Sequence, residues 1–237
     1  MTPRPRTPLS RRERPAKPAL TRAGIVATAV AVLRAEGLEK VTMRRLAQEL
    51  DTGPASLYVY VANTAELHAA VLDELLGEVD LNQAESVGDW RERLAGVLTS
   101  YTRMLFQHPA LARSALTARP TGEHSLRLLE RLLALLAEGD VPPAQAAFGV
   151  DVLLQFATAT AAEHATRAQF ADAAADWDAL TNALHEVSER THPHVHALAA
   201  SLLAGSPEER MSWSLRMLIN GIATTPVPDT TTDSPHP

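Results

Sequence analysis

The sequence predicts an all-α protein. Alanine and leucine dominate its 237 residues, alternation of Val and Thr is scarce, and the helical patterns break where Gly and Pro cluster. Hairpin signatures and the pattern of parallel sheets are absent. Apolar residues make up 46% of the chain, so a sizeable core can form, and the length suits one large domain or two smaller ones.

The composition excludes several classes of protein. The chain has no cysteine, so neither a disulfide framework nor a thiolate metal site is expected. No segment reaches the roughly 18 uninterrupted apolar residues of a membrane span. The Arg- and Pro-rich N-terminus lacks the apolar stretch of a secretory signal. We therefore expect a cytoplasmic protein without a membrane partner.

Charge is unevenly distributed along the chain. Residues 1–64 hold 11 of the 22 Lys and Arg but only 5 of the 28 Asp and Glu, a net charge of +6 that leaves −12 for the remainder. A basic end predicts contact with a polyanion, although a tail that only aids solubility is the alternative. Residues 1–19 are predicted to be a disordered basic arm, and residues 224–237 a disordered tail.

Four helices are expected in the N-terminal part. Residues 21–36 carry an apolar face and end at a glycine, and residues 42–50 begin at a threonine that is a suitable N-cap. Residues 54–60 begin at a proline, which favours the first helical position. A helix over residues 64–79 follows Asn63, which with Glu66 resembles a capping box.

The same signals predict further helices downstream. They cover residues 90–107, 110–118, 122–138, 143–169, 194–203 and 207–223. Residues 170–190 are poorly patterned, and we assign no helix there. No internal repeat is present.

The stretch "LAQELDTGPASLYVYV" predicts a helix-turn-helix. Asp51 stands where a helix end often needs a left-handed residue, and Gly53-Pro54 starts a second helix three residues later. Leu57 and Val61 then point inward, which leaves the hydroxyl groups of Tyr58 and its neighbours on the flanks. Such a surface suits phosphate oxygens and base edges in a major groove. The alternative is that Tyr58 packs against the body and shields the core.

Residues 20–66 resemble the DNA-binding domain of the tetracycline-repressor (TetR) family. The resemblance rests on 25–33, Gly37-Leu38, "VTMRRLAQEL", "ASLYVYV" and 63–67. Two positions depart from the family pattern, because Thr64 replaces the usual lysine and Asp51 the usual turn glycine. The resemblance implies a DNA-contact set of Thr42, Arg44, Pro54, Ala55, Ser56, Tyr58, Tyr60 and Thr64.

Residues 67–223 resemble the C-terminal effector-binding and dimerisation domain of the tetracycline repressor. The matching segments are "DWRERL", "RPT" at residues 119–121, "LERLLALL", residues 156–163 and "WSLRMLINGI". Ala115 falls at the place of the histidine that holds the drug-bound magnesium, and Val97 and Leu132 replace amide side chains. The implied lining suits an apolar ligand with few polar handles, and the alternative is that these residues are only core. The implied ligand positions are Val97, Tyr101, Ala115, Leu132, Phe156 and Glu163.

Two apolar stripes suggest a homodimer. Paired helices from each chain would bury them in a four-helix bundle, although a terminal helix could instead pack within its own chain. Twofold symmetry would make the DNA target a palindrome. The stripes consist of Val150, Leu153, Leu154 and Ala157 on the long helix and of Met211, Leu215, Leu218 and Ile222 on the last helix.

The sequence therefore predicts a dimeric, DNA-binding transcriptional repressor released from a palindromic operator by a small molecule. A ligand-independent or non-specific DNA-binding protein is the alternative, and a helical enzyme a further one. No phosphate loop, GxSxG elbow or HExxH motif favours an enzyme. His192 and His196 lie one helical turn apart, but no third metal ligand is evident. We expect no metal and no cofactor.

Overall fold

The computed structural model describes residues 19–85, 87–118, 120–167 and 173–228. Within these ranges the regular elements are eleven α-helices and two short 3₁₀ helices, and no strand occurs, which confirms the predicted all-α class. The predicted arm, apart from its last residue, lies outside the described part, as do Arg119 and residues 229–237.

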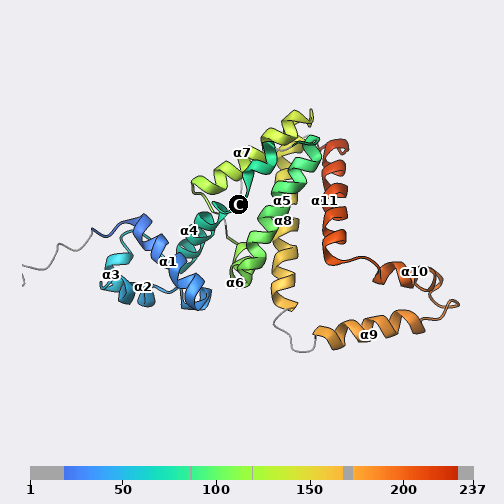
Figure 1. Ribbon diagram of the computed structural model, residues 1–237, viewed down its shortest axis with the longest axis horizontal. Helices are drawn as coiled ribbons and strands as arrows, with labels where there is room; N and C mark the ends of the chain where they lie inside the picture. Colours follow the sequence, from blue (N-terminus) through green and yellow to red (C-terminus); the bar gives the residue numbers. More distant parts are fainter. Residues whose placement is uncertain (1–18, 86, 119, 168–172, 229–237) are drawn as a thin grey trace, which may run out of the picture.

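The N-terminal head contains three helices and one 3₁₀ turn (blue to cyan in Figure 1). Helix α1 (Arg22–Glu36) is capped by Thr21 and ends at Gly37, whose φ of 91° favours glycine. The turn η2 (Leu38–Lys40) leads into α2 (Met43–Glu49), and α3 (Pro54–Leu57) follows. Helix α3 ends three residues before its predicted end, because residues 58–60 continue only as a hydrogen-bonded turn.

Helix α4 (Thr64–Leu76) joins the head to the body (Figure 1). It packs against α1 on one side and against α5, α6 and α7 on the other. Asn63 caps its first turn by accepting a hydrogen bond from the Glu66 amide at 2.9 Å, as predicted. The Glu66 carboxylate accepts from the Ala62 amide at 2.7 Å, one residue before the position that a strict capping box uses.

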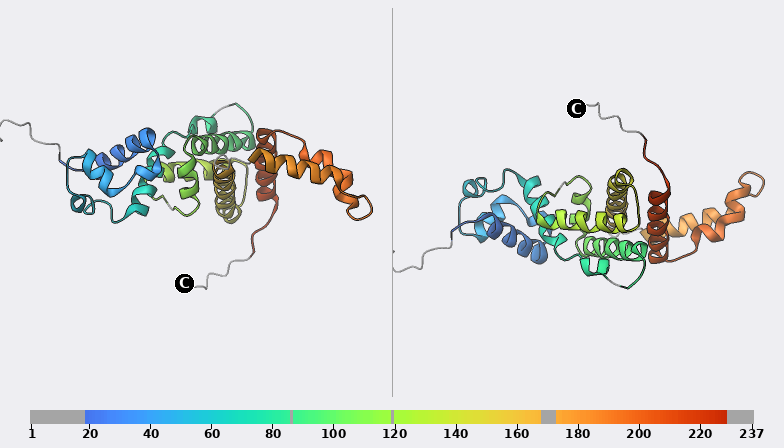
Figure 2. Two further views of the ribbon diagram at one scale, coloured as in Figure 1. Left: turned by 90° about the horizontal axis from the view of Figure 1, so that it is seen from below. Right: turned by 90° about the horizontal axis from the view of Figure 1, so that it is seen from above.

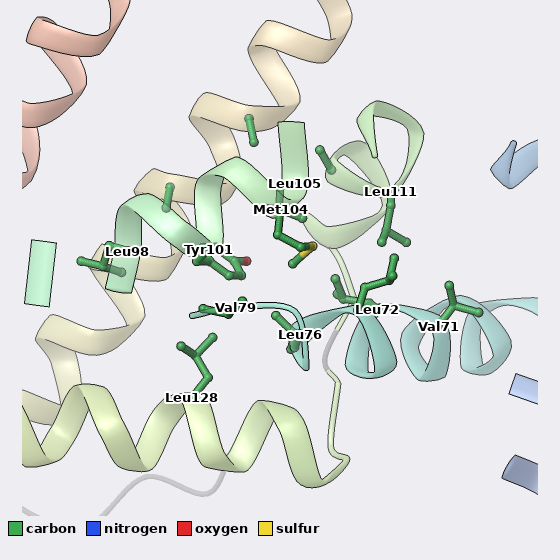
Figure 3. Packing of buried hydrophobic residues seen from close by; sticks show 14 of the residues in the cluster. Val71, Leu72, Leu76, Val79, Leu98, Tyr101, Met104, Leu105, Leu111 and Leu128 are labelled. Carbon is green, nitrogen blue, oxygen red and sulfur yellow. The ribbon is translucent and has the colours of Figure 1, made fainter. Parts of the chain in front are cut away.

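The body is built around α8 (Pro143–Arg167), which contacts α5, α6, α7 and α11 (Figure 2). These neighbours are α5 (Trp90–Gln107), α6 (Pro109–Ala115), α7 (Glu123–Glu138) and α11 (Pro207–Thr224), with η3 (Leu81–Glu85) before α5. Figure 3 shows Leu72 and Leu76 of α4 directed toward Tyr101 and Leu105 of α5. One continuous apolar cluster therefore extends from the head through α4 into the body.

Helices α9 (Ala173–Glu186) and α10 (Pro193–Leu203) form a hairpin that extends away from the body in all three views (Figures 1 and 2). The two helices pack mainly on each other. The sequence left residues 170–190 without an assignment, and α9 spans most of that range. Its apolar residues Trp177 and Leu180 are each 47% exposed, so α9 is a helix without a buried face in this chain.

Gly139 lies against the indole of Trp90 and should not accept a side chain. A Cβ at Gly139 would lie 2.2 Å from Cε2 of that ring, which is itself buried. We expect Gly139→Ala to lower the free energy of unfolding by about 1–3 kcal/mol, measured by chemical denaturation. Combining it with Trp90→Leu should cost less than the sum of the two single changes, because the smaller side chain leaves room for the methyl group. Strict additivity would contradict this explanation.

Candidate nucleic-acid interface and ligand cavity

The turn between α2 and α3 is fixed by its own sequence. Asp51 adopts a left-handed conformation with φ of 48°, as predicted, and the Thr52 amide donates to the Ala47 carbonyl at 2.8 Å. Gly53 then occupies the N-cap of α3. Leu57 is fully buried, so the opposite side of this short helix faces outward.

All eight residues of the predicted DNA-contact set are exposed on the head. Tyr58 is 53% exposed and Tyr60 is 36% exposed, which argues against the alternative that Tyr58 shields the core. Their contact with DNA stays a prediction. The eight are Thr42, Arg44, Pro54, Ala55, Ser56, Tyr58, Tyr60 and Thr64.

The two arginines of α2 have different environments. Arg45 lies between Glu36 and Glu49, with N–O distances of 2.6 and 2.7 Å. The hydrogen bond from Arg45 lowers the pKa of Glu36, and the two carboxylates raise the pKa of Arg45 further above its ordinary value. Arg45 thus holds α2 to the end of α1. Arg44 is exposed and has no ion pair within the described part of the chain, so its charge faces solvent.

A cavity of about 410 Å³ lies between α4, α5, α7, α8 and the end of α6. At its wall the hydroxyls of Tyr101 and Thr158 form a buried hydrogen bond of 2.7 Å, and burial raises the pKa of Tyr101. Leucine and alanine side chains make up most of the remaining lining. The lining residues are Leu72, Leu76, Tyr101, Ala115, Leu116, Ala118, Pro120, Ser125, Leu128, Leu129, Asp151, Leu154, Gln155, Thr158 and Ala159.

Only two of the six predicted ligand positions, Tyr101 and Ala115, line this cavity. Val97 and Leu132 are fully buried in the core instead. Phe156 is half-buried against the core, and Glu163 is exposed and paired with Arg167 at 2.6 Å. These four are not among the residues that line this cavity, and their contact with a ligand stays a prediction.

The sequence interpretation missed most of the lining. Leu72 and Leu76 of α4 lie one turn apart, and α8 contributes Leu154 and Thr158 at the same spacing. Asp151 and Gln155 add a carboxylate and an amide to the α8 wall. The sequence offered one signal for this wall. On the face of α8 that is not core, polar and apolar side chains are mixed one helical turn apart.

The cavity is linked to α4 through the start of α7. The Asp73 carboxylate of α4 accepts a hydrogen bond from the Ser125 amide at 2.9 Å, and so satisfies a free N–H of the first turn of α7. The hydroxyl of Ser125, which lines the cavity, donates to the Gly122 carbonyl at 2.9 Å. Gly122 leaves no space here, since a Cβ would lie 2.0 Å from the Asp73 carboxylate.

Half of the residues in the predicted dimer stripes are buried within the chain. Val150, Leu153, Ala157 and Leu215 are buried in one chain, so assigning them to an interface between chains was wrong. The reason is that the stripes of α8 and α11 pack on the body, and Ile222 closes over Gly149. The other four, Leu154, Met211, Leu218 and Ile222, are half-buried. The large apolar side chains that α8 and α11 expose are Phe148, Val152, Trp213 and Met217.

The histidines near α10 serve local structure. His192 hydrogen-bonds the Thr191 hydroxyl at 2.9 Å, and His196 the Val187 carbonyl at 3.1 Å. Across the described ranges no group of three His, Cys, Asp or Glu side chains could hold a metal ion. Nor does any helix in those ranges have the length and apolar character needed to cross a bilayer.

Comparisons with known proteins agree with this architecture. Residues 25–71 match the model of bacterial regulatory proteins of the tetR family, and residues 82–225 match that of the tetracyclin repressor-like C-terminal domain. An HTH-type transcriptional regulator of Saccharopolyspora erythraea is 35% identical over 121 residues, which are 51% of each chain. The chain thus spans about half the length of this curated relative.

Solved structures cover more of the chain. The transcription regulator SCO7704 of Streptomyces coelicolor is 63% identical, covers 90% of this chain and 98% of its own, and superposes with a TM-score of 0.74. ActR of Streptomyces coelicolor, in complex with actinorhodin, is 36% identical, covers 86% of this chain and 96% of its own, and has a TM-score of 0.76. The chain therefore belongs to the tetR family of bacterial regulatory proteins and has a tetracyclin repressor-like C-terminal domain.

Proposed function

We propose that the protein is a homodimeric transcriptional repressor that a small, largely apolar molecule releases from a palindromic operator. The observation that carries the proposal is that one helix, α4, connects the exposed surface of the head with the cavity of the body. Helix α4 packs on the head that exposes Tyr58 and Arg44, and its Leu72 and Leu76 line the cavity. Such a protein acts on the cytoplasmic chromosome and needs no catalytic group.

The head has the chemistry of a DNA-reading surface. Ser56, Tyr58 and Tyr60 each carry one exposed hydroxyl that can donate to a phosphate oxygen. The charge of Arg44 also faces outward. Residues 1–64 carry a net charge of +6, which attracts a polyanion. The names of the relatives, which are transcriptional regulators, support this assignment.

A second copy of the chain would cover the exposed apolar side chains of α8 and α11. Trp213 is 62% exposed and Met217 is 47% exposed on α11, while Phe148 is 50% exposed on α8. Contiguous exposed apolar surface marks interaction sites. A twofold pair of heads would then meet half-sites about 34–36 Å apart, or one or more turns further.

The cavity supports binding of an apolar ligand. Its volume of about 410 Å³ suits a small organic molecule. Tyr101, Asp151 and Gln155 offer a few polar contacts in a mostly aliphatic lining. ActR has been solved with actinorhodin and with (S)-DNPA, which supports a ligand-responsive function for a chain of the same fold. A ligand that enlarges the cavity would displace α4 and, with it, the head.

Replacing the reading residues should weaken operator binding without unfolding the head. We expect Arg44→Ala, Ser56→Ala and Tyr58→Ala each to reduce binding by about 1–3 kcal/mol, measured by fluorescence anisotropy on an operator first identified by footprinting the DNA beside the gene. Circular dichroism should remain unchanged, because all three side chains are exposed. Arg45→Ala is the control, since it should lower the melting temperature by releasing α1 from α2.

The outcome of the same titration separates the alternatives. A specific repressor prefers its operator over random duplex by orders of magnitude, whereas a non-specific DNA-binding protein binds both alike and loses affinity steeply with salt. If a variant that combines Arg44→Ala, Ser56→Ala and Tyr58→Ala bound the operator as tightly as the wild type, the reading surface would lie elsewhere.

The exposed apolar face of α11 should be needed for dimerisation. We expect Trp213→Lys combined with Met217→Lys to give monomers in sedimentation velocity and to abolish tight operator binding, because two charges would face an apolar partner surface. Leu126→Lys on α7, where Leu126 is 60% exposed, is the matched control and should remain dimeric. A double variant that stays dimeric would place the interface elsewhere.

Magnesium-tetracycline should not stabilise the protein. The cavity lining contains no histidine among the described residues, and Ala115 occupies the place that the family resemblance gives to the metal-binding imidazole. We expect no change in melting temperature with the complex present. A rise of several degrees would contradict the assignment of the cavity, because a ligand that binds only the folded state must stabilise it.

A further inference from the structure

The outermost side of α3 and the turn after it is apolar. Ala55 and Val59 are four residues apart, and both lie opposite the buried Leu57 on a helical projection. Val59 is 80% exposed, more than either neighbouring tyrosine. A solvated outer face ordinarily carries polar side chains, so this pair, which we call the Ala55–Val59 ridge, is unlike the outer faces of most surface helices.

The recognition segment from Pro54 to Tyr60 lacks every side chain that can read a base edge with two hydrogen bonds. It has no arginine, lysine, asparagine, glutamine or carboxylate. Bidentate pairing of these side chains is what distinguishes guanine, adenine and cytosine in the major groove. The hydroxyls of Ser56, Tyr58 and Tyr60 can both donate and accept, so one such bond does not separate the bases.

The thymine methyl is the apolar group that base edges present in the major groove. We propose that the Ala55–Val59 ridge reads thymine C5-methyl groups, so that each half-site of the operator has thymines beneath α3. Specificity there comes from apolar contact, while the flanking hydroxyls hold the phosphates. This inference rests on the proposed DNA-binding function and names the base that the surface selects. Arg44 lies on α2, outside the ridge, so its contribution is independent.

The size of the effect follows from burial of one methyl group. Removing such a contact weakens binding about fourfold, and removing one from each of two half-sites weakens it roughly 15-fold. The change is large enough to measure and small enough to leave specific binding intact.

The experiment uses the full chain and a library of random duplexes. The enriched palindrome is resynthesised with deoxyuridine at each half-site thymine in turn, which removes the methyl and keeps the hydrogen-bonding edge. A second series replaces the same T·A pair by C·G, and a third by 5-methylcytosine·guanine. We expect deoxyuridine to weaken binding roughly 15-fold at the positions under the ridge, and 5-methylcytosine to restore part of the loss caused by cytosine. Deoxyuridine outside the half-sites should have no effect.

A variant protein locates the reading group. Val59→Ala should bind the thymine and deoxyuridine operators within about twofold of each other at the thymine that Val59 contacts, because the shorter side chain no longer reaches that methyl. Val87→Ala is the matched control, since Val87 is fully exposed in the loop before α5, and it should keep the wild-type discrimination.

Each outcome decides one proposal. If no palindrome is enriched, the proposed repressor function fails. If a palindrome is enriched but deoxyuridine binds as well as thymine, the repressor function stands and the ridge proposal is overturned. Discrimination that survives undiminished at every half-site thymine in the double variant Ala55→Gly, Val59→Ala also overturns it, since the methyl contacts would then come from side chains outside the ridge.

Discussion

The burial of α4 against both halves of the molecule is the constraint on which the rest depends. Leu67, Val71 and Leu75 are fully buried along this 13-residue helix. Burying each side chain of this kind contributes roughly 1.5–3 kcal/mol, which is far more than the exposed ion pairs of the head contribute. The head therefore cannot rotate freely on the body. The orientation of the head follows that of α4. The position of α4 depends in turn on how it packs against α5 and α7.

The cavity lies between α4, α5 and α7. Leu72 and Leu76 form part of its wall, and the carboxylate of Asp73 holds the first turn of α7 at the cavity edge. In the proposed function, a molecule that fills the cavity would therefore press on the helix that carries the head. A helix responds as a unit, because its backbone hydrogen bonds make it stiff compared with the side chains around it. The arrangement connects occupancy of the body with the position of the reading surface without a long chain of intermediates.

Signals from neighbouring residues predicted the fold well. Features that depend on packing between distant segments were missed. Thr42, Asn63 and Asp51 acted as the sequence indicated, because caps and left-handed turns depend on neighbouring residues only. The stripe on α8 was recognised, but a stripe does not say whether its partner belongs to the same chain. Residues 170–190 lacked a signal because α9 exposes its apolar side chains. A linear resemblance did not show which residues line the cavity, because Val97 and Leu132 are buried in the core and do not belong to the lining. The outward direction of Val59 was available from its spacing to Leu57, but it was overlooked beside two tyrosines.

The contact between Gly122 and Asp73 also constrains how this protein can evolve. The two atoms that would collide, a Cβ at position 122 and a carboxylate oxygen at position 73, belong to segments far apart in sequence. A side chain gained at position 122 would force the Asp73 carboxylate to move, and its hydrogen bond with the Ser125 amide would be disturbed. Substitutions at the two positions should therefore be coupled, so that a side chain at position 122 is tolerated best where position 73 carries a residue smaller than aspartate.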